Sequence, residues 1–273
     1  MAEAAALGAA HNVLVIDTSY GSTVGIVGHE PIVETDSRTH VERLQANIAR
    51  ACTDAGLAPR DLDRIIVGTG PAPFTGLRAG IVAAKALAFA TGAELIGQNI
   101  LEPQALWNLK RLEAERRTET FEDRGRHTLT LAVNDARRRQ LYFELLDAAS
   151  CGDDTHRDVR KEPLIAMDID YPQRIVERVN AANQQGLTVD VVGHGSAKYA
   201  EILGRIAHVG AMLDDSVLDQ GRAGLSIFAS AAERTHRVFP DMPVEPLYLR
   251  RPDAAVPNPL KHVLGHGGAA NKR

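Results

Sequence analysis

The chain has 273 residues, which is enough for two lobes that each bury a core of their own. Its 44% hydrophobic and 24% charged residues are typical of a soluble globular protein, and a net charge of −4 excludes a general attraction to nucleic acid or anionic membranes. Two cysteines, Cys52 and Cys151, are too few and too far apart for a disulfide framework or a metal knuckle, so we expect reduced thiols in a cytoplasmic protein.

The first half of the chain alternates β-rich and helical patterns after an opening segment that lacks the features of a secretory signal. Three short β-rich runs, "NVLVIDTS", "STVGIVG" and "PIVETDSR", predict an antiparallel meander. In "HVERLQANIARACTDAGL" apolar residues recur at helical spacing until Gly56, and "DRIIVGTG" then predicts a buried strand. A helix from about Leu77 to Thr91 and a strand in "AELIGQ" complete this half.

The second half repeats that order of elements. A helix around Glu102 to Arg117 and the charged stretch "RTETFEDRGRH" lead to a hairpin of "TLTLAVNDAR" and "QLYFELLDA" and a weaker strand near "EPLIAMDI". The helix "YPQRIVERVNAANQQ", the strand "TVDVVGHG", the helix "SAKYAEILGRI" and a helix from about Leu225 to Val238 follow. The repeated order predicts a two-lobed α/β protein of the actin-like, sugar-kinase and Hsp70 fold class, each lobe a mixed sheet with helices. We place the lobes at residues 12–103 and 104–253 and expect residues 254–273 to form a flexible tail.

A glycine- and proline-rich turn opens "GTGPAPFTGLRAGIVAAKALAFATG", residues Gly68 to Gly92. The first N–H groups of a helix can bind an anion, but this stretch matches neither GxxxxGK[ST] nor GxGxxG. Pro71 and Pro73 each remove an N–H group that a phosphate would use. The pattern therefore favours a strand-to-helix connection with Thr75 or Gly76 at the cap.

Proteins of this fold class often bind ATP between two glycine-bearing hairpins, each led by an acidic residue. Here "NDARRRQ" has arginines where the second hairpin would need glycines, which argues against close wrapping of a phosphate. The loop "VVGHGSAKY" fits either adenosine binding or a strand that turns into a helix capped by Ser196. The candidate vestigial nucleotide site consists of Asp17, Ser22, Thr23, Asp135, Gly193 and Gly195. An ATP-dependent small-molecule kinase is therefore the alternative function.

Several segments resemble the TsaB (YeaZ-like) family of bacterial tRNA threonylcarbamoyladenosine biosynthesis proteins. "GPAPFTGLRAGIVAAKALA" is similar to the family signature GPGSFTGLRIG with its alanine-rich helix, although Ala72 and Pro73 replace the common Gly and Ser. "VIDTS", "HVERLQANI", "DARRRQLYFEL" and "EPLYLRRPD" follow in the family's order, so the resemblance covers residues 13 to about 253.

The resemblance implies a non-catalytic subunit that dimerises with a catalytic paralogue, TsaD, which transfers threonylcarbamoyl to the adenosine beside the anticodon of tRNA. It further implies that the ATPase TsaE joins the complex, that TsaC makes the adenylate, and that tRNA is bound only within the complex. ATP and a metal then belong to the partner subunits, and we expect this chain to bind no cofactor. We expect no membrane association, because Lys85 interrupts the longest apolar run. The sequence leaves three points open: the stoichiometry of the complex, whether a homodimer forms without the paralogue, and whether a nucleotide binds between the lobes.

The resemblance also implies that two helices of the first lobe pair with their counterparts in the partner. The predicted partner interface consists of Val41, Leu44, Ile48, Phe74, Arg78, Ala79, Ala83, Ala86 and Ala90. The four alanines form one stripe of small side chains along their helix, which would let another helix approach closely. Packing of this stripe on the chain's own sheet is the alternative.

Metal binding and a basic run are the last features to weigh. The paralogue uses an H-x-x-x-H pair, but here His40 is followed four residues later by Leu44, so we expect no metal site in this chain. "HVLGH" near the end has the spacing but lies in a glycine-rich stretch, so we expect only adventitious affinity there. The run 137–139, three arginines, fits either a solvated hairpin end or a contact to tRNA phosphates within a complex.

Overall fold

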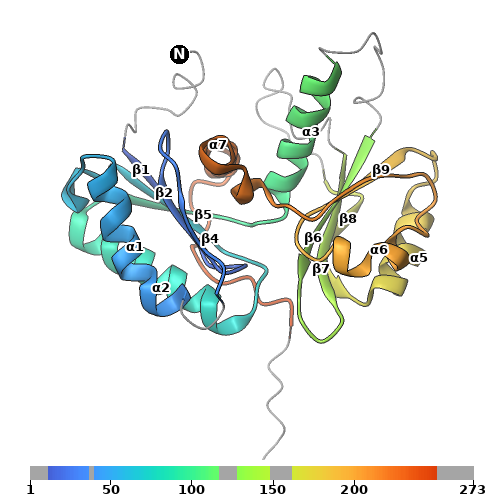
Figure 1. Cartoon of the computed structure of the whole chain (residues 1–273), viewed down its shortest axis with the longest axis horizontal. Coiled ribbons are helices and arrows are strands. Elements are labelled where there is room, and N and C mark those ends of the chain that lie inside the picture. The colour runs from blue at the N-terminus through green and yellow to red at the C-terminus, as the bar shows by residue number, and fades with distance from the viewer. Residues whose placement is uncertain (1–11, 37–39, 117–127, 148–161, 251–273) are drawn as a thin grey trace, which may run out of the picture.

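A computed structural model of the chain describes residues 12–36, 40–116, 128–147 and 162–250 (Figure 1). The opening segment, Cys151, the expected tail 254–273 and the "HVLGH" pair lie outside the described residues, as does most of the charged stretch after residue 116. Within the described ranges the chain forms two five-stranded sheets.

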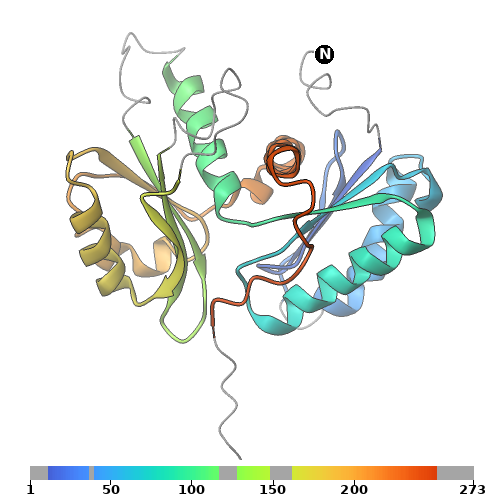
Figure 2. The same cartoon turned by 180° about the vertical axis from the view of Figure 1, so that it is seen from behind.

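The first sheet has the strand order β3-β2-β1-β4-β5. Strand β1 runs antiparallel to β2 and parallel to β4. Its strands are β1 (Val13–Asp17), β2 (Ser22–Ile26), β3 (Ile32–Glu34), β4 (Arg64–Gly68) and β5 (Glu94–Gln98). The outer face of this sheet carries α1 (His40–Asp54) and α2 (Phe74–Thr91), and a short 3-10 helix, η2 (Pro59–Asp61), precedes β4 (Figures 1 and 2). The helix α2 begins earlier than the sequence predicts, with Pro73 as its N-cap instead of Thr75 or Gly76.

The second sheet has the order β10-β9-β6-β7-β8, which reproduces the first sheet strand by strand in chain order. Its strands are β6 (Thr128–Asp135), β7 (Leu141–Asp147), β8 (Ile165–Asp170), β9 (Thr188–Val192) and β10 (Val209–Leu213). Its helices are α5 (Pro172–Ala182) and α6 (Ala200–Leu203), with 3-10 helices η3 (Ala197–Tyr199) and η4 (Val217–Gln220). This repetition confirms the predicted two-lobed α/β fold. The sequence reasoning missed the short edge strand β10 and made α6 too long.

Alternation along β1 shows how the layers form. Val13 and Val15 pack in a central cluster between the two sheets, whereas Leu14 and Ile16 pack in the core beneath α1 and α2. Successive side chains of a strand point to opposite faces, so an all-apolar strand of this kind must be covered on both sides. A separate core joins the outer face of the second sheet to α5 and α6.

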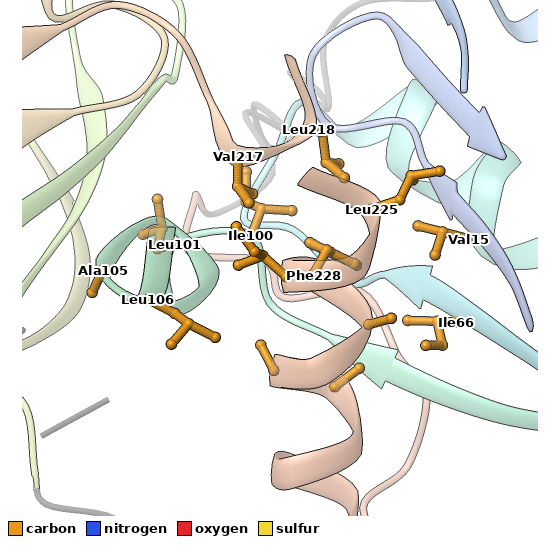
Figure 3. Close-up of a cluster of buried hydrophobic side chains, with 14 of the residues drawn as sticks. Val15, Ile66, Ile100, Leu101, Ala105, Leu106, Val217, Leu218, Leu225 and Phe228 are labelled. Atoms are coloured by element: carbon orange, nitrogen blue, oxygen red, sulfur yellow. The ribbon is translucent and has the colours of Figure 1, made fainter. Parts of the chain in front are cut away.

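Two helices fill the space between the sheets, and each packs on the sheet of the other half. The helix α3 (Glu102–Arg116) follows the first sheet but packs on β6, β7 and β9, and α7 (Gly221–Val238) follows the second sheet but packs on β5. Their shared cluster includes Val15 from the first sheet, Leu101 beside α3 and Phe228 from α7 (Figure 3). The predicted lobe boundaries stay a prediction, and this exchange of helices means that neither half is covered by its own residues alone.

A C-terminal strap, residues 239–250, leaves α7 and runs back toward the junction of the lobes (Figure 2). The N–H of Leu247 donates to the carbonyl of Thr69 at 2.8 Å, beside the first sheet. Arg250 then donates to Oε1 of Gln140 at 2.8 Å, in the hairpin between β6 and β7. The strap therefore links the two lobes.

By length and composition alone, α2 would qualify as a membrane span, with a mean hydropathy of 1.2 over 18 residues. In the fold its residues Leu77, Ile81 and Ala84 are buried in the core beneath the first sheet. A third of this window is buried inside the fold, and one helix of this kind is weak evidence for a membrane span.

Candidate functional site

The first acidic residue of the candidate nucleotide site, Asp17, ends β1 and is almost fully buried. Ser19 satisfies its carboxylate, since its N–H donates to Oδ2 at 3.1 Å and its hydroxyl donates to Oδ1 at 2.8 Å. Burial raises the pKa of Asp17 above its ordinary value, and the hydrogen bonds from Ser19 and the nearby His194 only partly oppose this. The carboxylate therefore holds its own loop in place, at the junction of the lobes.

The structure separates Ser22 and Thr23 from the loop that could meet a ligand. Both residues lie inside β2 and are buried, and Thr23 is the register partner of Asp17 in the neighbouring strand. The open cleft between the lobes is instead lined by residues 18–21, by residues 73–76 at the start of α2, and by Asp135 and Arg137. Ser22 and Thr23 do not line this cleft, because both are buried in the sheet, and their membership of a vestigial nucleotide site stays a prediction.

The second acidic residue, Asp135, ends β6 at the position that corresponds to Asp17 in the first sheet. Its Oδ2 accepts from Nζ of Lys198 at 3.0 Å, and its Oδ1 accepts from the N–H of Arg137 at 3.0 Å. The ammonium group of Lys198 therefore compensates the charge of this carboxylate. Both acidic residues of the candidate site thus have partners within the chain.

The glycine loop after β9 is occupied by a side chain of the chain itself. Oδ1 of Asp214 accepts from the N–H of Gly195 at 3.0 Å, the N–H of Ala197 at 2.9 Å and the hydroxyl of Ser196 at 3.2 Å. Gly193 and Gly195 have positive φ angles of 117° and 103°, and a Cβ on Gly193 would collide with the backbone of β6. Ser196 is the N-cap residue of η3 but makes no side-chain cap, and the carboxylate of Asp214 takes the N–H donors that an anion would need.

A stacked pair closes the junction above this loop. The ring of Tyr20 lies on the imidazole of His194, and Nε2 of His194 lies 3.1 Å from Oδ2 of Asp219 in η4. Sequence reasoning missed Tyr20, His194, Asp214 and Asp219, because their partners are distant in the chain. A histidine between two glycines after a buried strand was the available signal for His194.

The structure divides the predicted partner interface into core and surface. Leu44, Ile48 and Ala83 are buried in the core beneath the first sheet, so they present no surface to a partner. Their burial favours the alternative of packing on the chain's own sheet, and their part in a partner interface stays a prediction. The remaining predicted interface residues are at least partly exposed; they are Val41, Phe74, Arg78, Ala79, Ala86 and Ala90.

The exposed side of α2 carries large apolar residues that the sequence reasoning did not select. Phe89 is 94% exposed and Val82 is 64% exposed. They lie beside the exposed Ala86 and Ala90 in the C-terminal half of the helix. We call these four residues the α2 face. The residues of α2 that approach the sheet are both large and small, namely Leu77, Gly80, Ile81, Ala83 and Ala84, so residue size alone gave no signal for this face.

Within the ranges that the structure describes, no group of three or more His, Cys, Asp or Glu side chains is placed to hold a metal ion. The free thiol of Cys52 is buried in the core, and burial raises its pKa. A thiol in that state is a poor nucleophile.

Comparisons with known proteins agree with this architecture. A family model described as "TsaD: tRNA N6-adenosine threonylcarbamoyltransferase" matches residues 32–235. The fold is similar to that of YeaZ from Pseudomonas aeruginosa, with a TM-score of 0.60 and 22% identity over 87% of this chain and 99% of that one. A second structure, of an uncharacterized protein with similarity to peptidase YEAZ from the same organism, gives a TM-score of 0.59 at 23% identity.

Curated relatives match shorter stretches. An uncharacterized protein of Mycobacterium bovis is 38% identical over 138 residues, which are 48% of this chain and 57% of that protein. A tRNA N6-adenosine threonylcarbamoyltransferase of Cereibacter sphaeroides is 44% identical over 75 residues, which are 28% of this chain and 21% of that protein. The chain therefore spans little more than half of the mycobacterial relative and about a fifth of the transferase.

Proposed function

Because the chain belongs to the TsaD family of tRNA N6-adenosine threonylcarbamoyltransferases and has the fold of YeaZ, we propose that it acts in threonylcarbamoylation of tRNA as a non-catalytic subunit that pairs with a catalytic TsaD-type paralogue. The family match extends from β3 to α7 and so includes strands of both sheets. TsaE and tRNA would join through that complex. The proposal includes a cytoplasmic location.

The exposure of the α2 face is the observation that supports pairing with the paralogue. A phenylalanine that is 94% exposed and a valine that is 64% exposed on one side of a helix leave apolar area in water, which burial against a partner helix would remove. The neighbouring helix α1 contributes Ala46 and Ala49, which are exposed and small. Large side chains beside small ones allow close packing of a second pair of helices.

The satisfied site supports a non-catalytic role. Phosphate chemistry needs donors or a metal that can meet the substrate, but here Asp214 takes the glycine-loop donors and Lys198 neutralises Asp135. An ATP-dependent kinase, the alternative function, would need the Asp214 carboxylate to leave the glycine loop and Lys198 to separate from Asp135.

Pairing can be tested with purified chain and the TsaD-type paralogue by size exclusion with light scattering. Phe89→Asp should weaken the complex at least about a hundredfold, because a charge would be buried without a partner. Leu164→Asp is the matched control, since Leu164 is exposed beside the second sheet, far along the chain from α2. Mass analysis of tRNA nucleosides from cells depleted of this chain should show loss of threonylcarbamoyladenosine.

Two results would overturn the proposal. If wild-type chain and paralogue do not associate, the subunit role fails. If the chain alone modifies tRNA, or consumes ATP in the presence of a small-molecule acceptor, it is an enzyme in its own right and the kinase alternative gains support.

A further inference from the structure

The hairpin between β6 and β7 holds three consecutive arginines in an unusual backbone conformation. Arg137, Arg138 and Arg139 have φ angles of 62°, 50° and 64°. Residues other than glycine rarely adopt the left-handed region, and each such residue is strained there. Glycine or asparagine would form this turn at lower conformational cost, so the fold alone does not account for three arginines.

Two of the three arginines of this hairpin, Arg137 and Arg139, keep their guanidinium groups available for a ligand. All three arginines are exposed, and the nearby carboxylate of Asp135 is already paired with Lys198 at 3.0 Å. In the part of the chain that the structure describes, the guanidinium groups of Arg137 and Arg139 make no hydrogen bond or ion pair. A concentration of positive charge therefore projects from a protein whose net charge is −4.

The strap adds a fourth guanidinium to the hairpin. Arg250 donates through Nη2 to Oε1 of Gln140 at 2.8 Å and to the carbonyl of Arg137 at 3.5 Å. These contacts fix the hairpin to the end of the strap. We call residues 136–140 together with Arg250 the arginine hairpin.

Exposed aromatic rings lie next to this charge. Phe74, at the start of α2, stacks on Tyr248 of the strap with ring centroids 4.9 Å apart, and Arg78 lies over the Phe74 ring at 3.8 Å. Phe74 lines the same cleft as Arg137, and Tyr248 precedes Arg250 by two residues. In both views the β6–β7 hairpin, the start of α2 and the end of the strap lie at the same end of the molecule (Figures 1 and 2).

We propose that the arginine hairpin and the Phe74–Tyr248 pair form an RNA-binding surface that contacts the phosphates and an unpaired base of the tRNA substrate. Guanidinium groups bind phosphate oxygens with paired N–H donors, and exposed aromatic rings stack on bases that are not in a helix. An acidic protein surface would use the arginines but would leave the aromatic pair without a matching group. The inference rests on the proposed function for the identity of the RNA.

Binding of fluorescently labelled tRNA can be measured by anisotropy at several salt concentrations, with the complex of chain and paralogue. Replacing Arg137, Arg138 and Arg139 together by Gln should weaken binding at least about tenfold at low salt and make log Kd less dependent on log salt by about two units. The matched control replaces three exposed arginines elsewhere by Gln, at Arg60, Arg174 and Arg205. That variant has the same net charge and should bind as the wild type does.

A second variant separates binding from folding. Arg139→Gly removes one charge and relieves a left-handed residue, so its thermal midpoint should not fall while its affinity for tRNA falls severalfold. Tyr248→Leu should weaken binding with no change in the salt slope, because a stacking contact releases no counterions.

The outcomes keep this inference apart from the pairing proposal. Should the complex form and bind tRNA, but the triple variant bind with wild-type affinity and slope, the RNA surface is refuted while the subunit role stands. Loss of paralogue binding by the triple variant would show a protein contact instead and would also refute it. If no complex forms, tRNA binding is measured with the isolated chain. Weaker binding by the triple variant than by the wild type supports the RNA surface. Equal binding by the two, or no binding by the wild type, refutes it.

Discussion

The ring of Tyr20 stacks on the imidazole of His194, with centroids 3.8 Å apart and ring planes inclined by 18°. Tyr20 belongs to the β1–β2 hairpin of the first sheet, and His194 follows β9 of the second. Because Nε2 of His194 also lies 3.1 Å from Oδ2 of Asp219, the imidazole joins both sheets to η4, which leads into α7. This contact fixes the lobes relative to each other at the junction where the cleft begins.

Asp219 should make this junction sensitive to acid. Burial alone would raise the pKa of Asp219, but hydrogen bonds from His194 and the Ser216 N–H and the charge of His194 hold it below its ordinary value of 3.8. A carboxyl group whose pKa is lower in the folded state contributes stability above its unfolded pKa, and this contribution is lost as pH falls through the folded pKa. Asp219→Asn should therefore lower the free energy of unfolding at pH 7 by about 1–2 kcal/mol.

Urea titrations at several pH values would test this. The difference between wild type and Asp219→Asn should shrink as pH falls below about 4, since the wild-type carboxyl is then protonated as well. Asp241→Asn, at an exposed position in the strap, is the control and should show no difference at any pH. A difference for Asp219→Asn that stays constant down to pH 3 would mean that the ionised carboxylate is not what stabilises the junction.

Phe228 offers a second prediction, because it lies in the cluster between the two sheets and is fully buried (Figure 3). Phe228→Ala should lower the free energy of unfolding by about 3–5 kcal/mol, through lost burial and the cavity that remains. Phe89→Ala is the matched control in the isolated chain, since that ring is 94% exposed and its removal should change stability by less than about 0.5 kcal/mol. Equal effects of the two changes would contradict the placement of α7 between the sheets.

The order of the elements could be predicted from the sequence because it depends on local patterns. Apolar runs such as "RIIVG" and helical spacing in "HVERLQANI" identify their elements with little help from distant residues. The strand β10, "VGAML", was missed because it contains Gly210 and lies at the edge of its sheet, where it is only partly buried. Helix α6 ends at Leu203 because Gly204 follows, although the apolar pattern continues to Ile206.

Tertiary placement could not be predicted in the same way. The alanine stripe of α2 has helical spacing, but spacing does not say which side of the helix faces the sheet. The buried side of α2 holds Leu77 and Ile81 as well as Ala83, whereas the large Phe89 points outward, so neither the size nor the apolar character of a residue identifies the buried side. The capping of Gly195 by Asp214 was invisible for a related reason, since 19 residues separate the two and no local motif links them.

Arg64 leads to a third prediction, because it ties α7 to the first sheet. It lies at the start of β4 and is largely buried, and it pairs with Glu233 of α7 and, at 2.6 Å, with Glu94 of β5. The hydrogen bond from Arg64 lowers the pKa of Glu94, so the folded state gains stability from this group above its ordinary value of 4.5 and loses it on acidification. Arg64→Met should destabilise the protein by about 3–4 kcal/mol, mainly because Glu233 is left buried without a partner.

A double variant distinguishes an unpaired charge from lost packing. Arg64→Met combined with Glu233→Leu should recover most of the lost stability, because no buried charge then lacks a partner. Denaturant unfolding measures each variant, and Arg43→Met, at an exposed pair with Glu34, is the control and should change stability by less than about 1 kcal/mol. No recovery in the double variant would assign the effect to packing of the Arg64 side chain.

Asp214 gives the last prediction, which asks whether the glycine loop after β9 can still hold an anion. Asp214→Ala removes the acceptor for the N–H groups of Gly195 and Ala197 and for the hydroxyl of Ser196, and should destabilise the protein by about 1–3 kcal/mol. The freed donors would then be open to phosphate, so phosphate should raise the thermal midpoint of this variant more than that of the wild type. Asp214→Asn keeps an oxygen acceptor without the charge, and we expect it to show a smaller loss of stability and no response to phosphate. Sodium chloride at equal ionic strength controls for screening. If phosphate stabilises Asp214→Ala no more than the wild type, the loop is shaped for its own carboxylate alone, and the two glycines serve only close packing, of Gly193 on the backbone of β6 and of Gly195 on the Leu141 side chain of β7.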